Sequence, residues 1–268
     1  MKLKKIFLIL TALVAFSSAL TAVSDYEYLL GKYKPLIDDA FLVTIPGKNY
    51  LMMKTEVTQK QWQTVMENNP SYFKGDYLPV EKVSWIKAVE FCNALSEKQN
   101  LEKCYSNGHW AYYNKKKNKD VTEEDYNKDQ KKEYSKQQVI KYYAIDCNFN
   151  ANGYRLPTVE EWQYAAKGGQ EFEYSGSDNL DKVGWYKDNS GDKTHPVAQK
   201  KPNGYGLYDM SGNVWEWCWD SDGSGGRYFC GGSWYNDADY CEMGNRYWYD
   251  ADGTGKDVGF RIVRSTGK

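Results

Sequence analysis

The chain has 268 residues, of which 41% are hydrophobic and 26% are charged, a composition that suits one globular domain. The formal net charge is only −1, and without a basic groove nothing predicts nucleic acid as a partner. Aromatic residues reach 16%, with 24 Tyr and 10 Trp, and these two residue types suit partly wet contact surfaces as well as cores.

The N-terminus is typical of a secretory signal peptide. Three lysines within the first five residues precede an apolar run, Ile6–Phe16, that is too short to span a bilayer comfortably. Small residues follow as far as Ala22 and are suited to cleavage. We therefore predict a signal peptide over residues 1–22 and a mature chain that is secreted, periplasmic or cell-surface associated, without a membrane span. An uncleaved anchor is the alternative.

All six cysteines follow this segment, and an even number in an oxidising compartment favours disulfide bonds. We expect at least one bridge, and Cys104–Cys147 is a candidate because it would close the base of the charged segment between them. Buried free thiols are the alternative. There is no CxxC motif, and the only histidines are His109 and His195, so no Cys/His zinc site of the usual kind is predicted.

The first predicted elements are a short apolar strand at 41–46 and two amphipathic helices. Thr58, followed three residues later by Gln61, forms a capping box that predicts the start of the first helix. Ser84 is expected to cap the second helix, whose apolar residues recur at helical spacing. The highly charged stretch at 112–143 then predicts an exposed insertion or a solvated helix, to which we assign no chemistry.

A further helix is predicted within the stretch NGYRLPTVEEWQYAAKGG. Thr158 and Glu161 form a second capping box, and the glycine pair at 168–169 is a strong helix stop. Beyond this point Gly and Asn interrupt the chain every few residues, and aromatic residues alternate with polar ones. That pattern predicts short strands and long loops, so the fold class is α+β.

Five motifs, in this order, resemble the formylglycine-generating sulfatase-modifying domain family: VEKVSW…AVEFCNALSEK, NGYRLPTVEEWQYAAKGG, PNGYGLYDMSGNVWEWCWD, CGGSW and GFRIVR. They lie within the range from about Phe41 to Arg264. The resemblance implies a variant of the C-type lectin fold with two main helices, a small antiparallel sheet and much ordered loop. We expect it to form a single domain over residues 23–268.

The resemblance also identifies the positions where catalysis would occur. Enzymes of this family bind copper with two cysteines, at the third and eighth positions after the serine of the GGS motif. Here those positions hold Asn236 and Cys241. A carboxamide cannot become a thiolate ligand for soft Cu(I), so we expect no copper and no formylglycine formation. The His-x-x-x-His-x-Glu motif of an iron-dependent branch is also absent, and the prediction is a non-enzyme.

The stretch GGSWYNDADYCEMGNRYWYDADGTGKDVGFRIV resembles the C-terminal variable region of proteins that retroelements diversify. Tyr and Trp offer large contact area with few torsions, and Asn, Asp and Gly offer adaptable polar contacts. We expect the flanking GGSW and GFRIV motifs to be strands, and Trp234 and Phe260 to pack in the body. The predicted C-terminal surface, expected on one exposed face, comprises Tyr235, Asn236, Asp237, Asp239, Tyr240, Asn245, Tyr247, Trp248, Tyr249 and Asp250.

The segment LYDMSGNVWEW resembles the family segment that holds a structural calcium ion. The matching ligands are the side chains of Asp209 and Glu216 and the backbone carbonyls of Gly212 and Val214. An all-oxygen set suits a hard cation such as calcium. A turn stabilised without metal by Asp209 and Asn213 is the alternative.

These observations predict a secreted, non-catalytic protein that binds a protein, peptide or glycan through its C-terminal surface. Whether a retroelement diversifies that surface is left open by the sequence. Two other functions are alternatives: a copper-dependent formylglycine-generating oxidase, and a structural envelope protein that interacts without a variable site.

Overall fold

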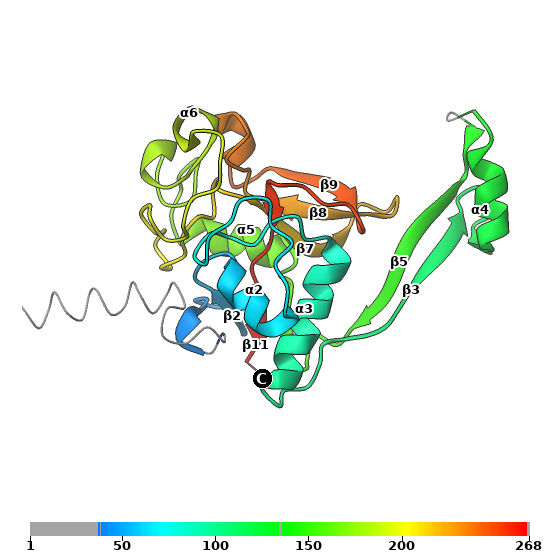
Figure 1. Ribbon diagram of the computed structural model, residues 1–268, viewed down its shortest axis with the longest axis horizontal. Coiled ribbons are helices and arrows are strands. Elements are labelled where there is room, and N and C mark those ends of the chain that lie inside the picture. Colours follow the sequence, from blue (N-terminus) through cyan, green and yellow to red (C-terminus); the bar gives the residue numbers. More distant parts are fainter. Residues whose placement is uncertain (1–36, 38, 134–135, 267–268) are drawn as a thin grey trace, which may run out of the picture.

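The computed structural model describes residues 37, 39–133 and 136–266. The predicted signal peptide at 1–22 lies outside the described residues. Figure 1 shows a body of helices, short strands and long loops, from which an arm of strands and one helix projects on one side. Among the described residues, none of the helices combines the length and the apolar character needed to cross a membrane.

The first two long helices of the body begin at the predicted caps. Before α2 (Gln59–Met66), the Thr58 side chain accepts from the Gln61 N–H, and the Gln61 side chain accepts from the Thr58 N–H at 2.8 Å. Ser84 caps α3 (Trp85–Lys98) by accepting from a backbone N–H of its first turn. Each cap satisfies donors that have no partner inside the helix.

The third predicted helix is α5 (Val159–Lys167). Its capping box joins Thr158 and Glu161, and it ends at Gly168, whose φ of 60° is in the left-handed region. Gly is favoured there because it has no Cβ to oppose that conformation. Beyond this point the described helices are short: α6 (Lys187–Ser190) and a few 3₁₀ turns, as the interrupted sequence pattern predicts.

One four-stranded sheet joins distant parts of the chain. Its strands are β1 (Leu42–Thr44), β2 (Tyr50–Met53), β6 (Tyr154–Arg155) and β11 (Val263–Ser265). Their order is β1-β2-β11-β6, and every pair is antiparallel. The apolar strand predicted at 41–46 is therefore present as β1, and one of the last described strands lies between two earlier ones.

The second four-stranded sheet carries most of the C-terminal segment. It contains β7 (Trp215–Ser221), β8 (Gly226–Cys230), β9 (Arg246–Asp250) and β10 (Val258–Gly259), in the order β10-β7-β8-β9. The pairs β7-β8 and β8-β9 are antiparallel, as predicted for the sheet, whereas the short strand β10 pairs with β7 in parallel. The GGSW motif at 231–234 is a loop and not a strand, because this stretch turns the chain away from the end of β8.

The charged insertion forms a projecting arm, defined here as Tyr105–Cys147. It consists of β3 (Tyr105–Asn114), β4 (Lys119–Val121), α4 (Glu123–Gln130) and β5 (Val139–Cys147). The strand order is β4-β3-β5, and all pairs are antiparallel. The segment is thus mainly a long strand pair and not a solvated helix, and its helix α4 lies near the tip (Figure 1).

The main core lies between α2, α3 and the C-terminal sheet. Trp62 and Phe91 stack with ring centroids 5.4 Å apart, and Phe260 packs edge-on against both. The Trp85 indole donates to the backbone carbonyl of Cys218 at 2.7 Å. Phe260 is therefore a core residue, as predicted.

All six cysteines are free thiols, so the predicted disulfide is not present. Cys104 and Cys147 lie where β3 and β5 meet, but no bond joins their sulfur atoms. Burial raises the pKa of Cys104 to about 11 and that of Cys147 to about 12. Their apolar surroundings thus hold both groups as thiols, whereas the thiolate is the form that reacts.

Candidate ligand-binding surface

Strand β9 is an exposed edge of the second sheet. Among the strands that the structure describes, only β8 pairs with it, and all five of its residues are exposed. Tyr247, Trp248 and Tyr249 retain 43%, 55% and 44% of their accessible surface. Because side chains alternate along a strand, Tyr247 and Tyr249 point to one face and Trp248 to the other. The predicted single face is therefore wrong for β9, because its side chains lie on both faces of the sheet at this edge.

Tyr247 links this strand to the loop before it. Its ring stacks on Tyr240 with centroids 5.4 Å apart, and it packs against the buried Trp215 at the same centroid distance. The Asn245 amide donates to the backbone carbonyl of Asp239, which holds the loop in place. These contacts bring the middle of the predicted surface together as one aromatic group on the body.

The beginning of the predicted surface rests on a buried tryptophan. Trp234 is 5% exposed, packs edge-on against Phe73 at 5.4 Å and donates its indole N–H to the carbonyl of Lys256. Tyr235, its neighbour in sequence, is 63% exposed. The prediction that Trp234 packs in the body is thus confirmed, and the boundary between core and surface lies between these two residues.

Asn236 and Asp237 are held by contacts within the protein. The Ser233 hydroxyl donates to Asn236 Oδ1 at 2.5 Å, and the Asn236 carbonyl accepts from the Lys187 N–H at 3.0 Å. The Lys187 ammonium donates to Asp237 Oδ1 at 2.8 Å. Both residues therefore help to shape the loop, which leaves the exposed aromatic rings as its principal contact groups.

Cys241 lies under this loop. It is completely buried, and burial raises the pKa of its thiol to about 12. Its carbonyl accepts from the Ser211 hydroxyl at 2.8 Å. A protonated, inaccessible thiol is poorly suited to act as a nucleophile or a metal ligand.

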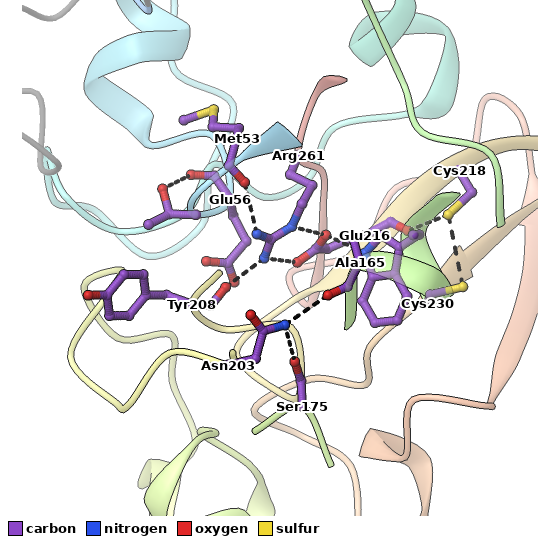
Figure 2. A network of polar contacts seen from close by, with 12 residues as sticks. Met53, Glu56, Ala165, Ser175, Asn203, Tyr208, Glu216, Cys218, Cys230 and Arg261 are labelled. Atoms are coloured by element: carbon purple, nitrogen blue, oxygen red, sulfur yellow. Dashed lines mark hydrogen bonds and ion pairs between the residues drawn. The ribbon is translucent and has the colours of Figure 1, made fainter. Parts of the chain in front are cut away.

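The residues of the predicted calcium segment take part in a buried polar network (Figure 2). Arg261 donates to both oxygens of Glu216, at 2.6 and 2.7 Å, and the Trp162 indole donates to one of them at 2.7 Å. Arg261 and Glu216 are both fully buried. Asp209 accepts from the Ala198 N–H through one oxygen, and its other oxygen has no partner among the described residues.

These contacts do not fit a calcium ion bound by Glu216. Both of its oxygens are already used, and a cation there would lie beside the positive guanidinium of Arg261. Gly212 and Val214 offer carbonyls in the predicted set, but the carboxylate that would anchor the ion serves the arginine instead.

We therefore expect the same melting temperature in EDTA and in millimolar calcium. An ion that binds only the native state raises the melting temperature by mass action. Thermal unfolding under the two conditions therefore shows directly whether calcium binds the folded protein. A calcium-dependent rise that disappears in Glu216→Gln would restore the site predicted from the sequence.

Sequence reasoning missed Glu56 and Arg261 as members of this network. Glu56 is fully buried, and neither of its carboxylate oxygens has a hydrogen-bond partner among the described residues. Burial, together with the nearby Asp209 and Glu216, raises the pKa of Glu56 well above its ordinary value. The arginine within the apolar GFRIV motif was the available signal, since a lone charge in such a stretch needs a buried partner.

Another buried carboxyl, outside this network, supports the loop under Trp234. Glu81 is fully buried and accepts the Phe73 N–H at 2.8 Å, while its other oxygen has no partner among the described residues. Burial raises the pKa of Glu81 from 4.5 to about 7. The folded state therefore favours the protonated form of Glu81.

This shift predicts a loss of stability as pH rises. A carboxyl with a raised pKa in the folded state contributes fully below its unfolded pKa of 4.5, and the contribution is lost as pH passes about 7. The free energy of unfolding is expected to fall by roughly 3 kcal/mol across this pH range because of Glu81. Urea unfolding at pH 4.5 and pH 8 should give a smaller difference for Glu81→Gln than for the native chain. Glu97→Gln, at an exposed position, is the control. If the free energy of unfolding changed between the two pH values by the same amount in both variants, the assignment would be contradicted.

Comparison with known proteins agrees with this architecture. Residues 39–266 match the family model described as the sulfatase-modifying factor enzyme 1-like domain. The chaperone protein LppX of Paenibacillus barcinonensis is 39% identical over 292 aligned positions, which cover 97% of this chain and 98% of that protein. The inactive C-alpha-formylglycine-generating enzyme 2 of Mus musculus is 33% identical over 137 positions, covering 43% of this chain and 44% of that protein.

A solved structure supports the predicted lectin-like fold. Treponema denticola variable protein 1 superposes with a TM-score of 0.65 and 36% sequence identity, covering 84% of this chain and 91% of that one. The predicted family, the α+β fold class and the resemblance to variable proteins are thereby confirmed.

Proposed function

Because the chain belongs to the sulfatase-modifying factor enzyme 1-like domain family, in which some relatives are named inactive, we propose that it is a non-catalytic ligand-binding protein. The observation that carries this proposal is strand β9, a sheet edge on which all five residues are exposed and three are aromatic. Exposed Tyr and Trp on a rigid frame are typical of binding surfaces, because they bury large area with few torsions to fix.

The chemistry at the family's copper position supports a non-enzyme. Asn236 has an amide where the resemblance requires a thiol, and that amide accepts from Ser233. Cys241, which occupies the second position, is buried as a thiol. Neither side chain offers a thiolate to a soft metal ion.

A protein or peptide is the ligand class that the relatives favour over a glycan. One relative that spans nearly the whole chain is named a chaperone, and chaperones act on polypeptides. The variable protein that shares the fold supports the idea that the exposed residues are open to change. The predicted signal peptide favours a secreted, periplasmic or cell-surface location, where such a partner would be met.

The proposal is tested against its catalytic alternative by product analysis. Purified protein, incubated with copper and a Cys-x-Pro-x-Arg peptide, is expected to give no aldehyde above a control without protein. Mass spectrometry detects the loss of the thiol directly, and an active formylglycine-generating enzyme is the positive control. Aldehyde above background would overturn the non-catalytic proposal.

Diversification is tested at the level of the gene. A second copy of the codons for residues 234–263 nearby, differing mainly at adenines and adjacent to a reverse transcriptase gene, is the expected finding if a retroelement acts here. Without such a copy, the surface is a fixed binding site.

A further inference from the structure

A cleft of about 890 Å³ separates β9 from the arm. The body side is formed by the end of β9 and by the hairpin between β7 and β8, and the arm side by β3, α4 and β5. Figure 1 shows the arm rising beside the end of this sheet. The cleft contains aromatic residues from both sides: Trp110 and Tyr126 from the arm, and Trp248 and Tyr249 from β9.

The base of the arm is fixed to the body, so the cleft exists before any ligand binds. Arg227 of β8 donates to the carbonyl of Tyr143 on β5 at 2.8 Å, and its guanidinium lies 3.9 Å from the centre of the Trp85 ring. The hairpin also touches the arm, since a Cβ at Gly225 would lie 2.3 Å from the carbonyl of Lys141. A site formed in advance loses less entropy on binding.

Charges of both signs lie at the cleft. The Lys141 ammonium is 3.8 Å from a carboxylate oxygen of Asp252 and 3.8 Å from the centre of the Trp110 ring. It therefore bridges the arm and the body. Asp250 lies on the body side and Lys115 on the arm side, so a ligand meets both cationic and anionic groups.

Trp248 offers an aromatic surface close to the backbone. A Cβ on Gly226, which lies diagonally across from it on β8, would lie only 2.7 Å from the Trp248 ring. The ring can rest there only because position 226 has no side chain. Trp248 nevertheless remains 55% exposed, so most of the ring is available to a ligand.

The backbone of Trp248 is directed to the open edge of the sheet. The Gly226 N–H donates to Oδ1 of Asp222 at 2.8 Å, and the Gly226 carbonyl accepts from the Asp222 N–H at 3.1 Å, so both backbone groups of Gly226 face the β7 side. Because backbone groups alternate in direction along an antiparallel strand, Arg227 then pairs with Tyr249, and the N–H and C=O of Trp248 point away from β8. An unpaired edge of this kind is a template for another extended chain.

We propose that the cleft binds an extended polypeptide segment, which adds to the edge of β9 at Trp248 and lies between Trp248 and Trp110. The arm is then the second half of the binding site. This inference rests on the proposed function and deepens it. A strand edge recognises the regular N–H and C=O groups of a peptide main chain, which a glycan lacks, and the mixed charges suit peptide side chains of either sign.

The test uses the whole protein and a library of random 12-residue peptides displayed on phage. Enriched sequences are synthesised with a fluorescent label and titrated by anisotropy. We expect Trp248→Ala and Trp110→Ala each to weaken binding at least tenfold, as for residues at the centre of an interface. Tyr72→Ala removes an exposed aromatic residue outside the cleft and should leave binding within twofold.

Two further measurements separate the parts of the proposal. Tyr126→Ala is a second arm variant, used if Trp110→Ala disturbs folding as judged by its melting temperature. Methylation of alternate peptide amides should abolish binding, because it removes the donors that pair with a strand edge.

Each contrary outcome has a distinct meaning. Binding that depends on Trp248 but on neither arm residue would overturn the role of the arm and leave the proposed function intact. Binding insensitive to amide methylation would overturn strand addition. If no peptide is enriched, or if a panel of defined glycans binds through Trp248 and Trp110 instead, the polypeptide assignment is overturned. If the affinity of the enriched peptides were unchanged in every variant, the result would count against the proposed function itself.

Discussion

Replacing Arg261 with Met is expected to destabilise the protein by about 3–5 kcal/mol, because it leaves a buried carboxylate without its cation. Arg261 makes two hydrogen bonds to Glu216 and two to backbone carbonyls, and it is fully buried. Without it, Glu56 and Asp209 also lose a cation that lowers the pKa of each. The loss of stability caused by Arg261→Met should therefore be larger at pH 8 than at pH 5, where the carboxyls can take up protons.

Urea unfolding of three variants tests this prediction. Arg264→Met, which breaks an ion pair with the exposed Asp39, is the matched control and should cost at most about 1 kcal/mol. Arg261→Met combined with Glu216→Gln should recover part of the loss, since the unpaired charge is gone. Equal midpoints for Arg261→Met and the control would show that the buried pair is not a principal contributor to stability.

The second large effect is expected from Phe260→Ala, at roughly 3–5 kcal/mol. Phe260 is fully buried against Trp62 and Phe91, and a cavity would remain in its place. Tyr235→Ala and Trp248→Ala should each change the free energy of unfolding by no more than about 0.5 kcal/mol, as is usual at exposed sites. Denaturant midpoints of the four proteins, including the native chain, measure this contrast.

This contrast also tests the assignment of the C-terminal surface without a ligand. Trp234→Ala serves as an internal reference, because Trp234 is buried next to the exposed Tyr235. If Tyr235 and Trp248 proved as costly to remove as Trp234, the aromatic residues would be structural, and the binding proposal would lose its main support.

Local features of this fold could be predicted from the sequence because a few neighbouring residues determine them. Thr58 with Gln61, and Thr158 with Glu161, form capping boxes whose partners are three residues apart. The spacing alone therefore identifies the start of each helix. The same holds for the stop at Gly168, which depends on one residue's backbone conformation.

Other features depend on residues far apart in the chain and could not be predicted. Glu216 resembles a calcium ligand in its local motif, but Arg261, 45 positions away, occupies both of its oxygens. Likewise, the charged composition of the arm indicated exposure but not the three-stranded sheet that it forms. The cleft arises only where the arm meets β9, and no sequence window contains both.

The place of β11 within its sheet has a consequence for the biosynthesis of the protein. Val263 pairs with Met52 on one side and Arg155 on the other, so the sheet has a gap until this late part of the chain has been made. Contacts between residues so distant in sequence form slowly, because a long loop must close first. The arm, whose strands pair locally, can form while the ribosome is still adding residues. The body must wait for β11, because its first sheet cannot close until this strand has been synthesised.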